Sequence, residues 1–204
     1  MTKRWWMSIA LAAVLSGCAS EPSVYYTLTP PVGAQPQDLS HAPGVGLYAL
    51  GAVSVPAPVD DVLIVVRQSD DRLMKLAHDR WTAPLGKQVG NALAVALTNE
   101  LGMPPLARTQ AGTDGKDVAS VSVDIQRFDL VPGQYAELSA LWQITPAKTS
   151  SRASRIVCYT KVRESVEPGV APLVKAQQAN IERLAKAVAA GLRAEKSGPQ
   201  TRCQ

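Results

Sequence analysis

The chemistry that the sequence marks most clearly belongs to the cysteine at position 18. Two basic residues, Lys3 and Arg4, precede a short apolar run over residues 5–15, and Leu15-Ser16-Gly17-Cys18 follows directly. Such a run is too short for a membrane-spanning helix, which needs about 20 residues, and is typical of a signal peptide. The small residues leave room for a peptidase, and a thiol is the nucleophile that lipidation requires. We therefore predict a signal peptide over residues 1–17 and a covalent lipid on Cys18.

The segment Leu15-Ser16-Gly17-Cys18 resembles the bacterial lipobox, which implies a diacylglycerol thioether on Cys18 and an acylated amino group. The alternative is an ordinary signal peptide with an incidental cysteine. Acyl chains bind a membrane with about 0.8 kcal/mol per buried CH₂, so several chains form a lasting anchor. No later segment is long and apolar enough to replace this anchor. Residue 19 is Ala rather than Asp, and by resemblance to lipoprotein sorting in enteric bacteria we expect the outer membrane's inner leaflet, with the domain facing the periplasm.

Two further cysteines, Cys158 and Cys203, remain after lipidation of Cys18. The bacterial periplasm is oxidising, and an even number of cysteines there favours a disulfide. We predict a Cys158–Cys203 disulfide. The alternative is a pair of free thiols, one buried in a strand and one in the C-terminal tail.

Enzymatic and metal chemistry find little support in the sequence. The two histidines are His41, in a segment rich in proline and glycine, and His78, which adjoins Asp79. A neighbouring His–Asp pair is more often a surface pair than a catalytic dyad, because triad geometry is specific. The sequence has no Gly-x-Ser-x-Gly elbow, no glycine-rich phosphate loop and no metal-ligand spacing. We expect no enzyme, no metal site and no cofactor beyond the lipid on Cys18.

The charge balance argues against a protein that binds nucleic acid. Removal of the first 17 residues leaves 187 of the 204, enough for one domain with a sizeable core. The removed segment holds two of the 21 basic residues and none of the 17 acidic ones, so the net charge falls from +4 to +2. This even balance is unlike the basic runs of nucleic-acid-binding proteins.

The chain divides into four parts. After the signal peptide, residues 18–43 are rich in Pro, Gly, Ser and Gln and are expected to form a tether, with one short strand at Val24–Leu28. A folded domain is expected over residues 44–196, and a tail over 197–204.

Hydrophobic periodicity predicts the elements of the domain. The predicted strands cover residues 44–55, 63–67, 72–77, 121–126, 137–144 and 155–166, and the predicted helices cover 83–101 and 170–194. Thr82 is the expected N-cap of the first helix and Gly102 its left-handed C-cap. The last helix partly fits a heptad, so a helical partner is the alternative to core packing. The pattern predicts a single α+β domain, with two main amphipathic helices packed on an antiparallel sheet.

Three short motifs carry a resemblance to a known family. The first is Tyr25-Tyr26-Thr27-Leu28. The second combines Val53-Ser54-Val55-Pro56, Asp60 and Ile64-Val65-Val66-Arg67, and the third is Arg80-Trp81-Thr82-Ala83-Pro84-Leu85. Their order and their distances from Cys18 resemble the ABC-type transport auxiliary lipoproteins, the PqiC-like family of membrane-integrity proteins, over roughly residues 18–190. Asp61 departs from the family, which commonly has Arg there, so a role tied to that Arg is in doubt.

The resemblance implies a non-catalytic subunit of a lipid-transport system. In such systems an ABC transporter complex, or an MCE-domain protein, moves phospholipid between the two membranes, and the auxiliary lipoprotein would dock that assembly. The residues expected to contact a partner are Tyr25, Tyr26, Arg80 and Trp81. The alternative is a carrier of lipid or lipopolysaccharide, or an outer-membrane assembly chaperone, and a carrier would need an apolar pocket of several hundred Å³. Self-association as a homo-oligomer stays open.

Several residues have both a structural and a functional interpretation. Trp81 is expected to be a hydrophobic staple in the core, with an interface anchor as the alternative. Arg67 and Trp142 are expected to have structural roles. A basic region near the last strand is either a solvated sheet face or a surface for anionic head groups. Its members are Arg152, Arg155, Lys161 and Arg163.

Overall fold

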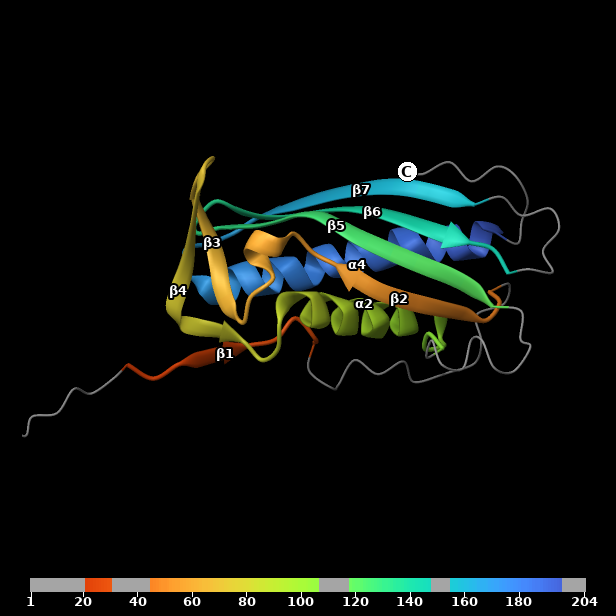
Figure 1. The fold of residues 1–204 in the computed structure, drawn as a ribbon, viewed down its shortest axis with the longest axis horizontal. Helices are drawn as coiled ribbons and strands as arrows, with labels where there is room; N and C mark the ends of the chain where they lie inside the picture. Colours follow the sequence, from red (N-terminus) through yellow and green to blue (C-terminus); the bar gives the residue numbers. More distant parts are fainter. Residues whose placement is uncertain (1–20, 31–44, 107–117, 148–154, 196–204) are drawn as a thin grey trace, which may run out of the picture.

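The computed structural model describes residues 21–30, 45–106, 118–147 and 155–195. Two sheets and two long helices form the domain (Figure 1). One sheet has four strands in the order β2-β5-β6-β7, and the other has three in the order β1-β4-β3. The elements are β1 (Val24–Tyr26), β2 (Tyr48–Ser54), the 3₁₀ helix η2 (Ala57–Val59), β3 (Leu63–Ser69), β4 (Arg72–Trp81), α2 (Leu85–Leu101), β5 (Ala119–Val131), β6 (Tyr135–Thr145), β7 (Ile156–Ser165) and α4 (Val170–Glu195).

The four-stranded sheet contains the predicted antiparallel meander. β5, β6 and β7 pair in sequence order, and Gly133 lies in the first turn with a φ of 67°, which glycine adopts without steric penalty. β2 pairs with β5 in parallel, a pairing that the sequence did not predict. Parallel neighbours require a long crossover, and here the β3–β4 hairpin and α2 lie between the two strands in the chain.

Both helices cover one face of the four-stranded sheet, and no described helix covers the other face (Figure 1). α2 and α4 also pack against each other. The apolar stripe of α2 is at most 1% exposed and comprises Leu85, Val89, Leu93, Leu97 and Leu101. The stripe of α4 is buried in the same core through Leu173, Ile181, Leu184, Val188 and Leu192. Core packing is therefore the role of both stripes.

α4 approaches β6 closely at Gly191. A Cβ atom at this position would lie 2.8 Å from Ile144 Cδ1 and 3.0 Å from two ring carbons of Trp142. Trp142 is 3% exposed, and its indole N–H donates to Thr160 Oγ1 at 2.9 Å. Trp142 is thus the core residue that its alternation predicted, and its ring leaves room for a glycine only.

The start of α2 differs from the prediction. The expected N-cap was Thr82, but the helix begins after Pro84, and the cap residue forms no side-chain hydrogen bond. Instead, Gly86 N–H donates to the Asp60 carboxylate at 3.0 Å. A carboxylate at this end satisfies an unpaired helix donor and faces the positive end of the helix dipole. Because Asp60 comes from a distant loop, local sequence did not reveal it. Gly102 ends the helix with a φ of 66°, as predicted.

The three-stranded sheet stands at one end of the molecule (Figure 1). β3 and β4 form the predicted hairpin, and β1 pairs with β4 in parallel. Ile64, Val65 and Val66 of β3 are buried, which confirms the predicted buried strand. Arg67 Nη2 lies 2.8 Å from Asp129 Oδ1 of β5, so an ion pair joins the two sheets.

The α+β class, the single domain and the two sheet-packed helices are confirmed. The expectation of one antiparallel sheet was wrong, because the strands divide between two sheets and two strand pairs are parallel. Cys18, Arg152 and Cys203 lie outside the described residues, as do the predicted signal peptide and tail, whereas Cys158 is buried on β7. Within the described segments, no helix combines the length and apolarity needed to cross a bilayer.

Candidate docking surfaces

The four residues expected to contact a partner lie side by side on β1 and β4. In the parallel register, Tyr25 is opposite Arg80 and Tyr26 is opposite Trp81. Trp81 is 2% exposed and meets Phe128 edge to face, with ring centroids 6.4 Å apart. The Trp81 ring therefore belongs to the core, as its staple interpretation expected, and does not itself present a surface.

The other three residues differ in exposure. Tyr25 is 64% exposed at the outer edge of the sheet. Arg80 is half-buried, and its Nε donates to Ser23 Oγ at 3.3 Å. Burial, together with a hydrogen bond to the Asp79 carboxylate, raises the pKa of Tyr26. Tyr25 and Arg80 thus form the accessible part of this edge.

The segment that follows β1 is held between the two helices. Leu28 is fully buried, and its backbone N–H donates to Gln88 Oε1 at 3.0 Å. The same oxygen accepts from the Thr27 hydroxyl at 3.2 Å, and Gln178 of α4 donates to the Thr27 carbonyl at 3.1 Å. Gln88 also donates to Thr82 Oγ1 at 2.5 Å. These contacts fix the place where the chain from Cys18 enters the domain.

Sequence reasoning missed Gln88, although the sequence carries a signal for it. Gln88 lies on the buried face of α2, between Leu85 and Val89, and is itself 4% exposed. A buried amide must find hydrogen-bond partners. A glutamine on an apolar stripe therefore predicts a polar contact from another segment, although it does not say which.

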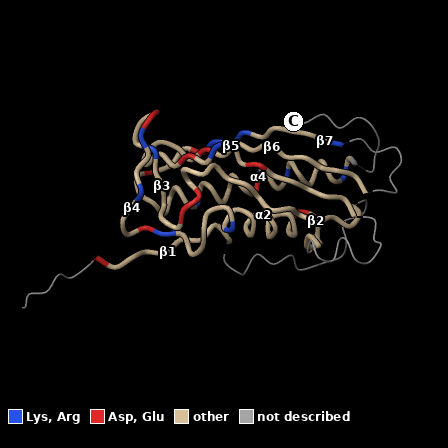
Figure 2. Tube along the Cα trace, in the orientation of Figure 1, with Lys and Arg blue, Asp and Glu red and all other residues tan. Residues whose placement is uncertain are grey.

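Six charged residues gather where the β3–β4 hairpin meets the four-stranded sheet (Figure 2). This charge cluster consists of Arg67, Arg127, Asp129, Glu137, Lys161 and Arg163. Asp129 and Glu137 are opposite each other on β5 and β6, and their side chains are 3% and 0% exposed. Four cations surround two buried carboxylates, so the cluster has a net positive charge.

Two of the four cations are fixed by hydrogen bonds. Arg67 donates from Nε and Nη2 to Asp129 Oδ1, at 3.0 and 2.8 Å. Arg163 donates from Nε to Glu137 Oε2 at 2.7 Å. These hydrogen bonds raise the pKa of both guanidinium groups. The positive charges of the two arginines thereby compensate the negative charges of the two carboxylates, as buried charges require.

The other two cations are held more loosely. Arg127 lies 3.4 Å from Asp129 Oδ2 and 3.8 Å from Glu137 Oε1, and Lys161 lies 3.4 Å from the same Glu137 oxygen. These two oxygens, Asp129 Oδ2 and Glu137 Oε1, accept no hydrogen bond within the described part of the chain. Arg127 and Lys161 are each 53% exposed. Their N–H donors therefore remain open to an external anion.

Two buried amide side chains of α4 hydrogen-bond to the backbone of the strands that carry the charge cluster. Gln177 Nε2 donates to the backbone carbonyls of Asp129 and Glu137, at 3.2 and 3.0 Å. Asn180 Nδ2 donates to the Ala136 carbonyl at 3.1 Å and to Gln177 Oε1 at 3.2 Å. These bonds fix the β5–β6 hairpin on α4, so the positions of the charges depend on the core.

Asp61, the departure from the family pattern, has a local structural role. Its carboxylate accepts from Leu63 N–H at 2.9 Å and from Lys75 Nζ at 2.5 Å. The Leu63 hydrogen bond, with help from Lys75, lowers the pKa of Asp61. Asp61 therefore ties the loop before β3 to β4.

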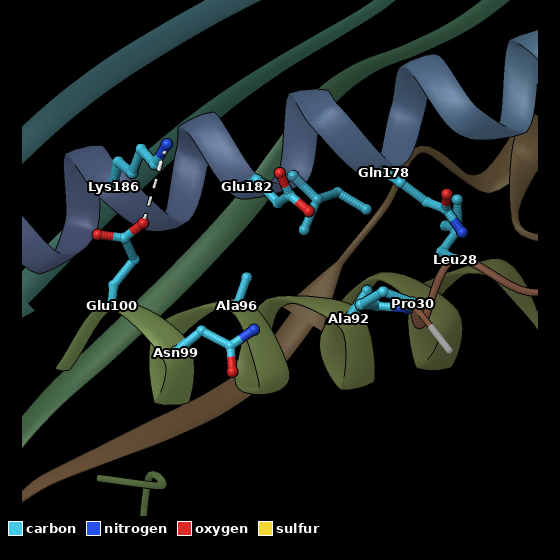
Figure 3. Close-up of a pocket in the computed structure, with 10 residues that line it drawn as sticks. Leu28, Pro30, Ala92, Ala96, Asn99, Glu100, Gln178, Glu182 and Lys186 are labelled. Carbon is cyan, nitrogen blue, oxygen red and sulfur yellow. Dashed lines mark ion pairs between the residues drawn. The ribbon is translucent and has the colours of Figure 1, made fainter. Parts of the chain in front are cut away.

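A solvent-open groove of about 230 Å³ runs between α2 and α4 (Figure 3). Glu100 and Lys186 face each other across it at 4.0 Å. Its apolar lining comprises Leu28, Pro30, Ala92, Ala96 and Ile181. Pockets that bury a drug-sized ligand measure about 300–1,000 Å³ and are mostly apolar. The groove is smaller and rimmed by charge, so it does not suit an acyl chain.

Metal-ligating side chains do not gather within the described part of the chain. None of its His, Cys, Asp and Glu side chains form a group of three or more that could hold a metal ion. His78 is partly exposed, and its Nε2 lies 3.6 Å from a carboxylate oxygen of Glu21. What the described residues present is an exposed strand edge and a basic sheet face, both of which suit contact with other macromolecules.

Comparison with known proteins places the chain among the transport lipoproteins. The family model of the ABC-type transport auxiliary lipoprotein component matches residues 26–189, and the chain belongs to this family. No curated protein matches the sequence.

Solved structures share the fold. A crystal structure of an uncharacterized protein superposes with a TM-score of 0.65 at 18% identity, and covers 84% of this chain and 99% of its own. Protein XCC0632 from Xanthomonas campestris, of the DUF330 family, superposes with a TM-score of 0.63 at 15% identity, and covers 85% of this chain and 97% of its own. At these identities the likeness establishes the fold alone.

Proposed function

We propose that this protein is a non-catalytic lipoprotein subunit of an ABC/MCE-type phospholipid transport system. It docks the transport assembly at the outer membrane, from the periplasmic side, and so supports envelope integrity. The family match over residues 26–189 carries the proposal. The lipobox at Cys18 supports a lipid anchor, and Ala19 supports the outer membrane's inner leaflet.

The way the N-terminal segment enters the domain supports a docking role. Gln88 and Gln178 hold the segment at Thr27 and Leu28, which are close in sequence to the predicted lipid attachment site. The ten residues that follow Cys18, as far as Leu28, span at most about 36 Å. The anchor therefore keeps the domain near its membrane, with the β1 edge close to the point of attachment.

The β1 edge is the first candidate for contact with the assembly. An edge strand offers backbone groups to another chain and needs either a cover or a partner. β1 is short, and its Val24 and Tyr25 side chains are 48% and 64% exposed. Arg80 on the neighbouring strand adds a charge beside Tyr25.

The alternative function, a carrier of lipid or lipopolysaccharide, has less support. It needs an enclosed apolar pocket, and the groove between α2 and α4 is open, small and charged at its rim. A docking role requires exposed surfaces only.

Complex formation between two purified proteins tests the proposal. The full-length lipoprotein, extracted from membranes in detergent, is mixed with the MCE-domain protein of the same bacterium, and complex formation is measured by size-exclusion chromatography. We expect a complex with the wild-type protein. Arg80→Glu should weaken it about tenfold, whereas Arg72→Glu, an exposed arginine at the other end of β4, should not. Both variants should melt within a few degrees of wild type, because surface substitutions change stability by about 0.5 kcal/mol or less.

Absence of a complex between the wild-type protein and the MCE-domain protein would refute the proposed partner. Phospholipid co-purifying in a stoichiometric amount with the domain would favour the carrier instead. Unchanged binding of Arg80→Glu would move the contact away from the β1 edge and leave the docking function in place.

A further inference from the structure

A second exposed surface lies on the helix-free side of the four-stranded sheet. Side chains of β7 alternate, so that Cys158 and Thr160 are buried whereas Val157 and Tyr159 are 51% and 54% exposed. Leu141 of β6 is opposite Tyr159 and is 42% exposed. We call the exposed set the β7 face, which consists of Leu141, Val157, Tyr159, Lys161, Arg163 and the adjoining Arg127.

The apolar part of the β7 face is unusual for a solvated sheet. In an antiparallel sheet with one face in water, the outward side chains are normally polar. Here three large apolar side chains adjoin one another, and each is at least 42% exposed. Tyrosine and arginine are over-represented at the centres of protein interfaces, and this face combines Tyr159 with arginines of the charge cluster.

The basic part of the face is ordered before any ligand arrives. Arg163 is held by Glu137 and lies over the Tyr135 ring, 3.9 Å from its centroid. Arg127 and Lys161 are placed by the buried carboxylates but keep free N–H donors, as described above. Cations that are already positioned lose less entropy when they bind a carboxylate. At the charge cluster four cations exceed two carboxylates, which favours an acidic ligand at this end of the face, whereas the exposed Asp124 lies opposite Leu141.

We infer that the β7 face binds an acidic protein segment of the transport assembly, in which carboxylates adjoin an aliphatic or aromatic side chain. Leu141, Val157 and Tyr159 would receive the apolar side chain, and Arg127 and Lys161 would bind the carboxylates. The inference rests on the proposed function for the identity of the partner. It adds a second contact, on a different sheet from the β1 edge.

A protein segment fits this face better than an anionic membrane does. The tip of the β3–β4 hairpin rises beyond the adjoining ends of β5, β6 and β7 and forms a corner with the sheet (Figure 1). A flat bilayer would meet the hairpin tip before it reached the adjoining strand ends, whereas a single protein segment can lie on the sheet beside the tip. Arg163 is also hydrogen-bonded to the buried Glu137 and so is not free to follow mobile lipid head groups.

The test measures binding of the purified MCE-domain protein to the full-length lipoprotein held in lipid nanodiscs. The substitutions on the β7 face are Tyr159→Ser, Val157→Ser and Lys161→Gln. The matched controls are Val62→Ser, at a valine that is 41% exposed, and Lys175→Gln, at an exposed lysine of α4. Lys161→Gln removes a charge without adding a negative one beside the buried Glu137, so the fold is preserved. Melting curves check that every variant is folded.

We expect Tyr159→Ser to raise the dissociation constant about tenfold or more, as for an interface hot spot. Lys161→Gln should slow association and reduce its salt dependence, because rim charges act mainly on the association rate. Both controls should stay within about twofold of wild type.

Four results would overturn the inference, and they are distinguishable. If the wild-type protein binds and Tyr159→Ser binds equally well, the β7 face is not a contact but the proposed function stands. If the wild-type protein does not bind, the proposed partner is refuted and the inference fails with it. If the β7-face variants keep the complex but lose binding to vesicles of phosphatidylethanolamine and phosphatidylglycerol, the face contacts a membrane. A wild-type complex that forms only between copies of the lipoprotein would equally contradict an acidic partner.

Discussion

A pair of glycine substitutions tests the packing that places the sheet on α4. Gly191→Ala adds a methyl group where α4 meets β6, and Gly90→Ala adds the same group to α2. At Gly191 the new Cβ would lie 2.8 Å from Ile144 Cδ1 and 3.0 Å from Trp142 ring carbons. At Gly90 the nearest atom is Val53 Cγ2 at 3.8 Å, an ordinary contact. The chemical change is the same, and only the surroundings differ.

The two substitutions are expected to change the free energy of unfolding in opposite directions. Replacement of glycine by alanine inside a helix is worth about 1 kcal/mol of stability, which both variants gain. Gly191→Ala also pushes into a closed core, because Ile144 is fully buried and Trp142 is bonded to Thr160. Such overpacking costs about 1–3 kcal/mol. Gly90→Ala should therefore be more stable than wild type by about 1 kcal/mol, and Gly191→Ala less stable by up to about 2 kcal/mol.

Urea unfolding of the domain, followed by circular dichroism, measures the difference. We expect the free energies of unfolding of the two variants to differ by about 1–3 kcal/mol, with equal m-values. In thermal melts this difference corresponds to at least about 2 °C. Equal stabilisation by the two substitutions would refute the close approach of α4 to β6 at Gly191.

Three further predictions concern the N-terminus, the cysteines and the acid response. Cys18→Ala should yield an uncleaved precursor without lipid, and acylated, cleaved protein detected by mass spectrometry in that variant would contradict the anchor assignment. Cys158 and Cys203 should form a disulfide worth about 4 kcal/mol at most, so unreduced, denatured protein should show no titratable thiol, and two reactive thiols would exclude the bond. The pKa of Asp61 is lowered in the folded protein, so its contribution to stability is present above the unfolded pKa of about 4 and is lost as the pH falls through the folded value. Asp61→Asn should therefore lower the melting temperature at neutral pH but not in strong acid, and an equal decrease at both pH values would count against the Lys75 and Leu63 contacts.

The candidate site was only partly predictable from the sequence. The short strand β1 followed from an apolar island in a polar segment, and the burial of Trp81 followed from its place before an amphipathic helix. The structure shows the edge position of β1 and the exposure of Tyr25. The charge cluster was not predicted as a unit. Lys161 and Arg163 were recognised as basic. Asp129 lies beyond the strand predicted over residues 121–126, and a register shift between Ile125 and Arg127 brings it opposite Glu137. Arg67 of the β3–β4 hairpin reaches across from the other sheet and pairs with Asp129.

What the sequence determined by itself was local. The apolar stripes of α2 and α4 specify helices because a period of 3.6 residues puts them on one face, and the alternation in β5, β6 and β7 specifies strands because their period is two. The lipobox and Gly102 are equally local signals. Other features join segments that are far apart in the chain. They are the division into two sheets, the parallel pairing of β2 with β5, the hydrogen bond from Gly86 to Asp60, and the hydrogen bond from Leu28 to Gln88. Such contacts form only where packing brings a buried donor or acceptor to a partner that can satisfy it, and no periodicity within either segment records that partner.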